Sequence, residues 1–360
     1  MVNSKILEIT PYQPGKPIEE VKRELGLKEV IKLASNENPL GPSPKAVSAL
    51  RNALAKINRY PEGSCFFLRR ALSKKLKLKP GNLIFGNGSD EIIDIIIKTF
   101  TGINDEILTG DVTFLEYKII AQQNGRKAVS VPLKDFKYDL TALKAGITSK
   151  TKVIFIANPN NPTGTYINKQ EVADFLSGLP DNILVVFDQA YLEFAGKKDF
   201  PGALDYLKQN KNIIILRTFS KIYGLAGLRI GYAIAREEFI RHLERCRQPF
   251  NVNSLAQAAA QAALADRAFV QRTQKLVRVE KRYLYKELSG LTLKFVPSAA
   301  NFILMDLGRD GLQTAKEFLK RGVIVRDMKQ YGLENFIRVT IGTNKENKKF
   351  IKELKNILNR

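Results

Sequence analysis

Four polar segments follow apolar runs in the middle of the chain, and each contains a residue that could take part in chemistry. Gly88-Ser89-Asp90 follows NLIF, Asn161 follows KVIFIA, and Asp188 ends NILVVFD. Ser220-Lys221 follows NIIILR, and Arg229 comes soon after it. A lysine amine can form a Schiff base with a carbonyl compound, and a glycine-led helix start can bind a phosphate. With a carboxylate to pair with a pyridine nitrogen, these groups form the set that pyridoxal phosphate requires.

Each segment taken alone has an ordinary structural interpretation. Asp188 could cap a helix, the residues around Asn161 are typical of a turn, and an isolated lysine is most often exposed to solvent. The order of the segments and their shared position after apolar runs favour one common site. The sequence contains no G-x-x-x-x-G-K-[ST] segment, and GLAGLRIGY lacks the G-x-G-x-x-G spacing, so the nucleotide-binding motifs are excluded.

The apolar runs are predicted to be buried strands that position these segments. They alternate with helix-like stretches such as SDEIIDIIIKTF, a rhythm typical of an α/β fold with a mostly parallel sheet. Ligands bind outside the carboxyl ends of the strands in such sheets, so the four segments should meet there. We predict an N-terminal arm over 1–30, a large cofactor-binding domain over 31–270 and a smaller α+β domain over 271–360.

The composition argues against several other classes of protein. The 360 residues are 44% apolar and include only Cys65, Cys246 and a single histidine, His242. A disulfide framework is excluded, and neither a serine–histidine hydrolase nor a metal site is expected. No apolar run approaches the ~20 residues of a membrane span, and the N-terminus lacks the apolar core of a signal peptide. A cytoplasmic protein is therefore expected.

The formal net charge is +22, from 58 basic and 36 acidic residues. Such an excess could indicate a nucleic-acid-binding protein or the attraction of anionic small molecules. The basic residues are spread along the chain, and no basic block is interleaved with aromatic residues. A generally basic surface is the preferred interpretation, and no nucleic-acid partner is expected.

The sequence resembles the fold type I aminotransferases, and among them the histidinol-phosphate aminotransferases, over nearly its whole length. The segments that carry the resemblance are TPYQPGKP (10–17), SNENPLGPSP (35–44), RYPEGS (59–64), NPNNPTG (158–164), RTFSKIYGLAGLRIGY (217–232) and VIVRDMKQYGLENFIRVTIGT (323–343). The resemblance implies a pyridoxal-phosphate-dependent exchange of an amino group between L-histidinol phosphate and 2-oxoglutarate, a step of histidine biosynthesis.

The resemblance also implies a role for each matched residue at the cofactor. Lys221 would form the Schiff base and move the proton of the substrate Cα, and Asp188 would pair with the pyridine nitrogen. The remaining cofactor contacts would be Asn161 and Tyr191 at the ring oxygen, Phe114 on the ring, and Ser89, Ser220 and Arg229 at the phosphate with Gly88 and Asp90 beside them. Tyr60 would reach the cofactor phosphate of the neighbouring subunit, so a homodimer is expected.

The substrate contacts implied by the resemblance come mainly from the C-terminal part. Arg338 would take the anionic group attached to the substrate Cα, and Asn161 would also contact the substrate. Arg326 and Tyr12 would help to hold the substrate phosphate. A second guanidinium is a physical reason to expect a phosphorylated substrate, because a phosphate offers more charge and more acceptor oxygens than a carboxylate.

Two positions depart from the usual family pattern. Phe114 stands where the family often has tyrosine, which keeps the aromatic face and loses a hydroxyl. Gln189 stands where glutamate is commoner, which leaves the neighbouring aspartate and tyrosine in place. Two alternatives of the same fold remain open, an aromatic-amino-acid aminotransferase and a phosphothreonine decarboxylase.

Overall fold

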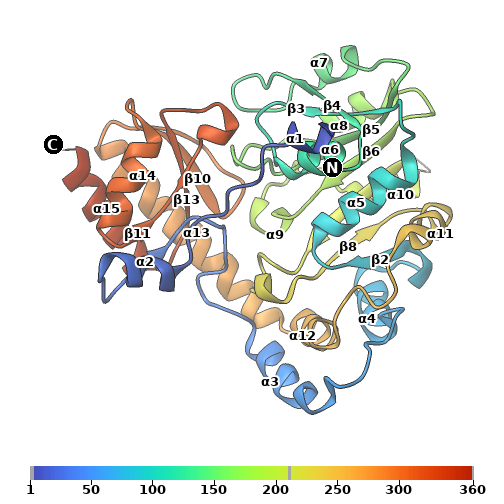
Figure 1. The fold of residues 1–360 in the computed structure, drawn as a ribbon, viewed down its shortest axis with the longest axis horizontal. Coiled ribbons are helices and arrows are strands. Elements are labelled where there is room, and N and C mark those ends of the chain that lie inside the picture. Colours follow the sequence, from blue (N-terminus) through green and yellow to red (C-terminus); the bar gives the residue numbers. More distant parts are fainter. Residues whose placement is uncertain (1–3, 210–211, 359–360) are drawn as a thin grey trace.

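The computed structural model describes residues 4–209 and 212–358, which form two lobes joined by a long helix (Figure 1). Within these ranges, the first lobe is built on a seven-stranded sheet and the second on a four-stranded sheet. The long helix, α13 (Arg267–Gly290), runs from the first lobe into the second. The domain boundary predicted near residue 270 falls in the first turn of this helix.

The sheet of the first lobe carries the apolar runs seen in the sequence. Its strand order is β2-β8-β7-β6-β5-β3-β4. The strands are β2 (Leu83–Gly86), β3 (Glu106–Gly110), β4 (Lys127–Val131), β5 (Thr151–Ala157), β6 (Leu184–Asp188), β7 (Ile213–Thr218) and β8 (Gly231–Ile234). β8 is antiparallel to both of its neighbours, whereas the other strands share one direction. The predicted α/β fold with a mostly parallel sheet is confirmed.

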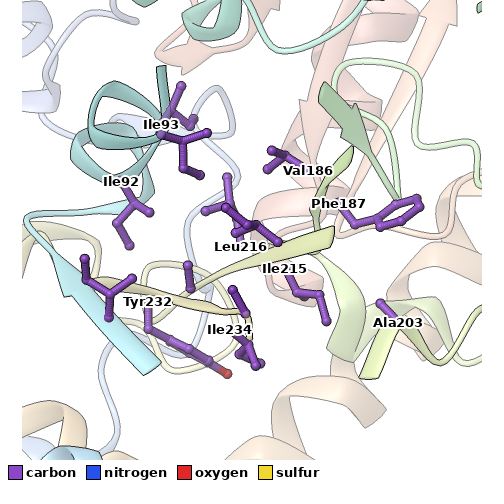
Figure 2. Close-up of a cluster of buried hydrophobic side chains, with 14 of the residues drawn as sticks. Ile92, Ile93, Val186, Phe187, Ala203, Ile215, Leu216, Tyr232 and Ile234 are labelled. Carbon is purple, nitrogen blue, oxygen red and sulfur yellow. The ribbon is translucent and has the colours of Figure 1, made fainter. Parts of the chain in front are cut away.

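Helices cover both faces of this sheet. Figure 2 shows Ile92 of α5 (Ser89–Phe100) on the same side as Leu216, and Phe187 on the side of α10 (Ala203–Lys208). Successive strand residues point to opposite faces, so a strand covered on both sides must be apolar at nearly every position. This requirement explains the uninterrupted runs of β5, β6 and β7, whose core side chains are buried.

The other helices are arranged around the two sheets and the connection between them. They are α1 (Ser4–Leu7), α2 (Ile18–Leu25), α3 (Pro44–Ala53), α4 (Phe66–Leu76), α6 (Glu116–Gln123), α7 (Leu140–Ala145), α8 (Lys169–Ser177), α9 (Leu192–Ala195), α11 (Glu237–Cys246), α12 (Ser254–Leu264), α14 (Gly311–Lys320) and α15 (Asn344–Leu358). Short 3-10 turns occupy Leu54–Lys56, Pro80–Asn82, Ala226–Leu228 and Lys329–Tyr331. In the described ranges, no helix is long and apolar enough to cross a membrane.

The second lobe has an antiparallel sheet of order β12-β13-β10-β9. Its strands are β9 (Lys294–Val296), β10 (Phe302–Asp306), β12 (Arg326–Asp327) and β13 (Phe336–Thr340). A further pair joins β1 (Ile31–Lys32) in parallel to β11 (Val323–Ile324). Val21 and Ala34 also pack against Ile324. The chain around β1, which sequence reasoning assigned to the large domain, therefore lies against the C-terminal lobe.

Candidate active site

A cavity of about 250 Å³ lies at the carboxyl ends of the central strands, where the second lobe meets the first. The predicted site residues that line it are Tyr12, Ser89, Asp90, Phe114, Asn161, Asp188, Tyr191, Ser220, Lys221, Arg229 and Arg338. Parallel strands deliver their following loops to one edge of the sheet, which is why segments far apart in sequence meet here. Gly88, Tyr60 and Arg326 do not line the cavity.

Asp188 is the last residue of β6 and is buried. Its Oδ2 accepts a hydrogen bond of 2.8 Å from the hydroxyl of Tyr117, and its Oδ1 accepts one of 3.0 Å from the backbone N–H of Ala190. Burial raises the pKa of the carboxyl to about 6, although both hydrogen bonds favour the charged form. A buried carboxylate held by neutral donors suits a cationic partner such as a protonated ring nitrogen.

Lys221 lies just after β7 and is half-buried. Its Nζ donates a hydrogen bond of 3.2 Å to the backbone oxygen of Ser35. The same atom lies 5.6 Å from the centre of the Tyr191 ring. Within the part of the chain that the structure describes, Nζ has no carboxylate partner at ion-pair distance, so the amine remains available to a ligand in the cavity.

The first turn of α5 and the segment after Lys221 form an anion-binding corner. Gly88 precedes the helix with φ of 86°, and a Cβ there would lie 2.5 Å from Nη2 of Arg229. Only glycine allows this approach of the guanidinium. Arg229 also pairs with Asp90 at 2.9 Å. The backbone N–H groups in the first turn of α5, the hydroxyl of Ser220 and the guanidinium are donors typical of a phosphate site.

Arg338 of β13 is a buried cation in the wall of the cavity, 5% exposed. Its Nη1 donates to Oδ1 of Asn161, and its Nη2 donates to the backbone oxygen of Ala34 at 2.7 Å. Among the described residues, its Nε has no hydrogen-bond partner. Both partners of the guanidinium are neutral, and a buried charge is costly unless it is paired. The arrangement therefore calls for an anionic ligand.

Arg326 and Tyr60 lie outside the cavity. Arg326 is 6% exposed. Its guanidinium donates to the backbone oxygen of Gln13 and to Oε1 of Gln330, and lies 5.2 Å from the centre of the Tyr12 ring. Because Tyr12 itself lines the cavity, Arg326 is one layer behind the wall. Tyr60 is 84% exposed and stacks on Phe250 with ring centres 4.9 Å apart.

Sequence reasoning missed several residues of the site, and three of them contact its central side chains. Tyr117 contacts Asp188, Ser35 contacts Lys221, and Asn36 donates a hydrogen bond of 3.0 Å to the hydroxyl of Tyr191. The spacing of three residues between Phe114 and Tyr117 could have indicated that both face the same side of a helical turn. Across the described ranges, no group of three or more His, Cys, Asp or Glu side chains could hold a metal ion.

Comparisons with known proteins agree with this geometry. The family model of class I and II aminotransferases matches residues 28–354. The histidinol-phosphate aminotransferase of Moorella thermoacetica is 51% identical over 98% of this chain and 92% of its own length. The one of Caldicellulosiruptor saccharolyticus is 44% identical over 99% of this chain and 100% of its own length. The chain belongs to the class I and II aminotransferases, in the histidinol-phosphate aminotransferase family.

A solved structure of a histidinol-phosphate aminotransferase from Sinorhizobium meliloti, in complex with pyridoxal-5'-phosphate, superposes with a TM-score of 0.91. It is 26% identical and covers 99% of this chain and 97% of its own. As a member of this aminotransferase family, the protein is an enzyme with the fold type I architecture. An L-threonine-O-3-phosphate decarboxylase from Porphyromonas gingivalis, at 24% identity, shares the fold alone. The two alternatives of the same fold are not favoured by these relatives.

Proposed function

We propose that the protein transfers an amino group between L-histidinol phosphate and 2-oxoglutarate, with pyridoxal 5'-phosphate bound in the cavity around Lys221. In the reverse direction, imidazole-acetol phosphate and L-glutamate react, a step of histidine biosynthesis in the cytoplasm. The observation that carries the proposal is Arg338, a buried cation in the same cavity as Lys221 and Asp188 whose hydrogen-bond partners among the described residues are all neutral. Support also comes from relatives named histidinol-phosphate aminotransferases, 51% and 45% identical over nearly the whole chain.

The side chains around the cavity fit the ring of the cofactor. Asp188 supplies a buried negative charge for the ring nitrogen, and Phe114 supplies an apolar face. Asn161 and Tyr191 supply polar groups for the ring oxygen. When bound, pyridoxal phosphate acts as an electron sink that makes the Cα–H bond of the substrate acidic.

The phosphate of the cofactor fits the corner at the start of α5. Ser89 and the N–H groups of the first turn, together with the positive end of the helix dipole, favour an anion there. Ser220 adds a hydroxyl and Arg229 adds a guanidinium. The ion pair between Arg229 and Asp90 orients this guanidinium beside Gly88.

Lys221 has two tasks in this proposal. It would hold the cofactor covalently in the resting enzyme until a substrate amine takes its place. The amine of Lys221 would then be placed to move a proton between the substrate Cα and the cofactor, as a general base and then a general acid. The backbone oxygen of Ser35, 3.2 Å from Nζ, is an acceptor that keeps this amine at the wall of the cavity.

The two substrates share one anion site and differ at a second. Arg338 binds the carboxylate of glutamate in one half-reaction and the phosphate of histidinol phosphate in the other. Tyr12 lines the cavity, and the centre of its ring lies 5.2 Å from the Arg326 guanidinium. We assign both residues to the phosphorylated substrate, with Arg326 exchanging its contact to Gln13 for the phosphate.

A second copy of the chain completes the site in this proposal. Large apolar side chains are exposed in the segment that leads into α4 and in its first turn, where Ile57 is 61%, Phe67 66% and Tyr60 84% exposed. Contiguous exposed apolar surface often marks an interaction site. We assign these side chains to a homodimer in which Tyr60 reaches the cofactor phosphate of the other subunit. The proposal requires no nucleic-acid or membrane partner.

A coupled assay tests the substrate assignment. Cofactor-loaded protein is given 2-oxoglutarate with histidinol phosphate, phenylalanine or tyrosine, and glutamate formation is measured. A charge-assisted hydrogen bond contributes about 1.5–3 kcal/mol, so histidinol phosphate should be favoured at least ~10-fold in kcat/KM. Turnover of phenylalanine or tyrosine without turnover of histidinol phosphate would indicate an aromatic-amino-acid aminotransferase. Release of carbon dioxide from a phosphorylated amino acid would indicate a decarboxylase.

A further inference from the structure

The segment 34–36 contacts three different polar side chains of the cavity with three consecutive residues. The backbone oxygen of Ala34 accepts a hydrogen bond of 2.7 Å from Arg338, and that of Ser35 accepts one of 3.2 Å from Lys221. The third residue uses its side chain, whose Nδ2 donates to the hydroxyl of Tyr191 at 3.0 Å. One short segment thus touches the proposed anion site, the lysine and the proposed donor to the cofactor ring.

The third residue, Asn36, is fixed from several directions. Its φ is 56°, in the left-handed region where asparagine is tolerated better than most residues. Its N–H donates to Oγ1 of Thr340 at 2.8 Å, and its backbone oxygen accepts from Nδ2 of Asn301 at 3.1 Å. These side chains are at most 3% exposed. Asn36 therefore belongs to a buried network that reaches from β13 to Tyr191.

The network also sets the orientation of the Asn36 amide. Oγ1 of Thr340 receives the backbone N–H of Asn36, so its own proton is available for Oδ1 of the same residue, 3.2 Å away. With Oδ1 facing Thr340, Nδ2 faces Tyr191. The opposite orientation would leave the threonine proton without this acceptor, and buried polar groups are normally paired.

This orientation determines what the Tyr191 hydroxyl can do. A phenol has one proton to donate and lone pairs that accept. Because Asn36 donates to it, Tyr191 keeps its proton for another acceptor, and the residue lines the cavity. We propose that Asn36 is a positioning residue that directs the Tyr191 proton to the ring oxygen of the bound cofactor, an assignment that rests on the function proposed above.

The consequence can be measured without turnover. In the covalently bound cofactor, the proton on the nitrogen that joins it to Lys221 would lie beside the negative ring oxygen. When this proton is lost, the ring oxygen lacks a partner, so a hydrogen-bond donor at this oxygen favours the deprotonated form. The visible absorption band of the cofactor changes with this ionisation. Loss of the Tyr191 donor, or of the group that orients it, should therefore raise the pH midpoint of the spectral change.

Asn36→Gly is the test variant, because glycine accepts a φ of 56° and the change adds no charge. A neutral hydrogen bond contributes ~0.5–1.5 kcal/mol, so the midpoint should rise by roughly 0.5–1 pH unit. In a Tyr191→Phe background, the same substitution should add no further rise. An unchanged midpoint in Asn36→Gly would overturn the proposal, as would equal rises in both backgrounds.

Two substitutions at Thr340 provide a matched pair if Asn36→Gly does not fold. Thr340→Val keeps the shape and removes the hydroxyl that orients the amide, so the midpoint should rise. Thr340→Ser keeps the hydroxyl and should leave the midpoint unchanged. Equal midpoints in the two variants would overturn the role of the network. A wild-type enzyme that shows no visible band after loading would instead contradict the proposed function, so the two failures are distinguishable.

Discussion

The hydroxyl of Tyr117 donates a hydrogen bond of 2.8 Å to Oδ2 of Asp188, and both side chains are buried. The bond joins α6 to the end of β6, at the carboxylate assigned to the cofactor ring. Burial raises the pKa of Asp188 to about 6, and the hydrogen bond from Tyr117 opposes that rise. Tyr117 therefore helps to keep the carboxylate charged for the ring nitrogen.

Tyr117→Phe should make cofactor binding more sensitive to acid. The variant removes the donor, so the pKa of Asp188 should rise further and the carboxylate should be neutralised at a higher pH. The affinity for pyridoxal phosphate, measured by absorbance titration from about pH 5 to about pH 8, should then begin to fall at a higher pH than in the wild type. Tyr138→Phe, another buried tyrosine without a hydrogen bond to Asp188, is the control. Superimposable wild-type and Tyr117→Phe profiles would contradict this role.

Asp188 should also make the cofactor-free protein less stable at neutral pH than an uncharged variant. Burial raises its pKa from the ordinary value of 3.8 to about 6 in the folded chain, so the folded state holds its proton more tightly. The contribution of Asp188 to the free energy of unfolding is fully present below pH ~4 and is lost as the pH rises through about 6. The difference of about two pKa units corresponds to at most ~3 kcal/mol in the free energy of unfolding.

Urea unfolding of cofactor-free wild type and Asp188→Asn measures this effect. As the pH rises from about 4 to about 7, the free energy of unfolding of the variant should increase relative to that of the wild type. The altered hydrogen bonds of the variant subtract a cost from this difference. Asp181→Asn changes an exposed carboxyl and serves as the control. A difference between wild type and Asp188→Asn that does not vary with pH would show that the buried carboxyl does not titrate in this range.

The parts of the fold that the sequence could predict are those with a local signal. β5, β6 and β7 are continuous apolar runs, because both of their faces are covered. β4 gave no such signal, since this edge strand of five residues has no buried position. The pairing of Ile31 with Val323 was also invisible, because contacts between the two ends of a chain leave no local pattern.

The same limit applies to the site. Lys221 and Asp188 could be found because each is a charged residue at or just after the end of an apolar strand. Tyr117 belongs to a short helix and reaches a residue 71 positions away. The sequence motif that contains Asn36 was recognised, but its contact with Tyr191 depends on how the segment folds against β13. Arg326 lies 5.2 Å from the centre of the Tyr12 ring and does not line the cavity, so its contact with the substrate phosphate stays a prediction.

The two C-terminal arginines should contribute differently to the two half-reactions. Arg326→Leu should lower the efficiency with histidinol phosphate at least ~10-fold, because a charge-assisted hydrogen bond is lost. The glutamate half-reaction should fall much less. Arg338→Leu should impair both halves. Single-turnover absorbance changes measure the halves separately, and equal losses in both halves of Arg326→Leu would show a purely structural role.

Gln330→Leu is the matched control for Arg326. It removes the side chain that ties the arginine to the N-terminal segment, through contacts to Gln13 and Pro11, and leaves the charge in place. If Gln330→Leu lowers the efficiency as much as Arg326→Leu, then the loss comes from the order of the segment around Tyr12. If it has a much smaller effect, the guanidinium itself is required.

Mixed dimers should reveal whether the two subunits share their sites. Lys221→Ala and Tyr60→Ala subunits, each nearly inactive alone, should form a heterodimer with one site that carries both defects and one that carries neither. Co-refolding should therefore restore activity, up to half of the wild-type value per heterodimer. Light scattering establishes the oligomeric state in parallel. A fully active monomer would contradict the shared site.

Borohydride reduction of the cofactor-loaded enzyme tests the central claim most directly. Reduction should remove the visible absorption band and fix the cofactor covalently to one lysine, which peptide mapping can identify. The account predicts that the label is on Lys221, and that Lys221→Ala binds the cofactor without becoming labelled there and loses nearly all turnover. Stable labelling of another lysine, with Lys221 unmodified in active enzyme, would contradict the assignment of this cavity as the active site.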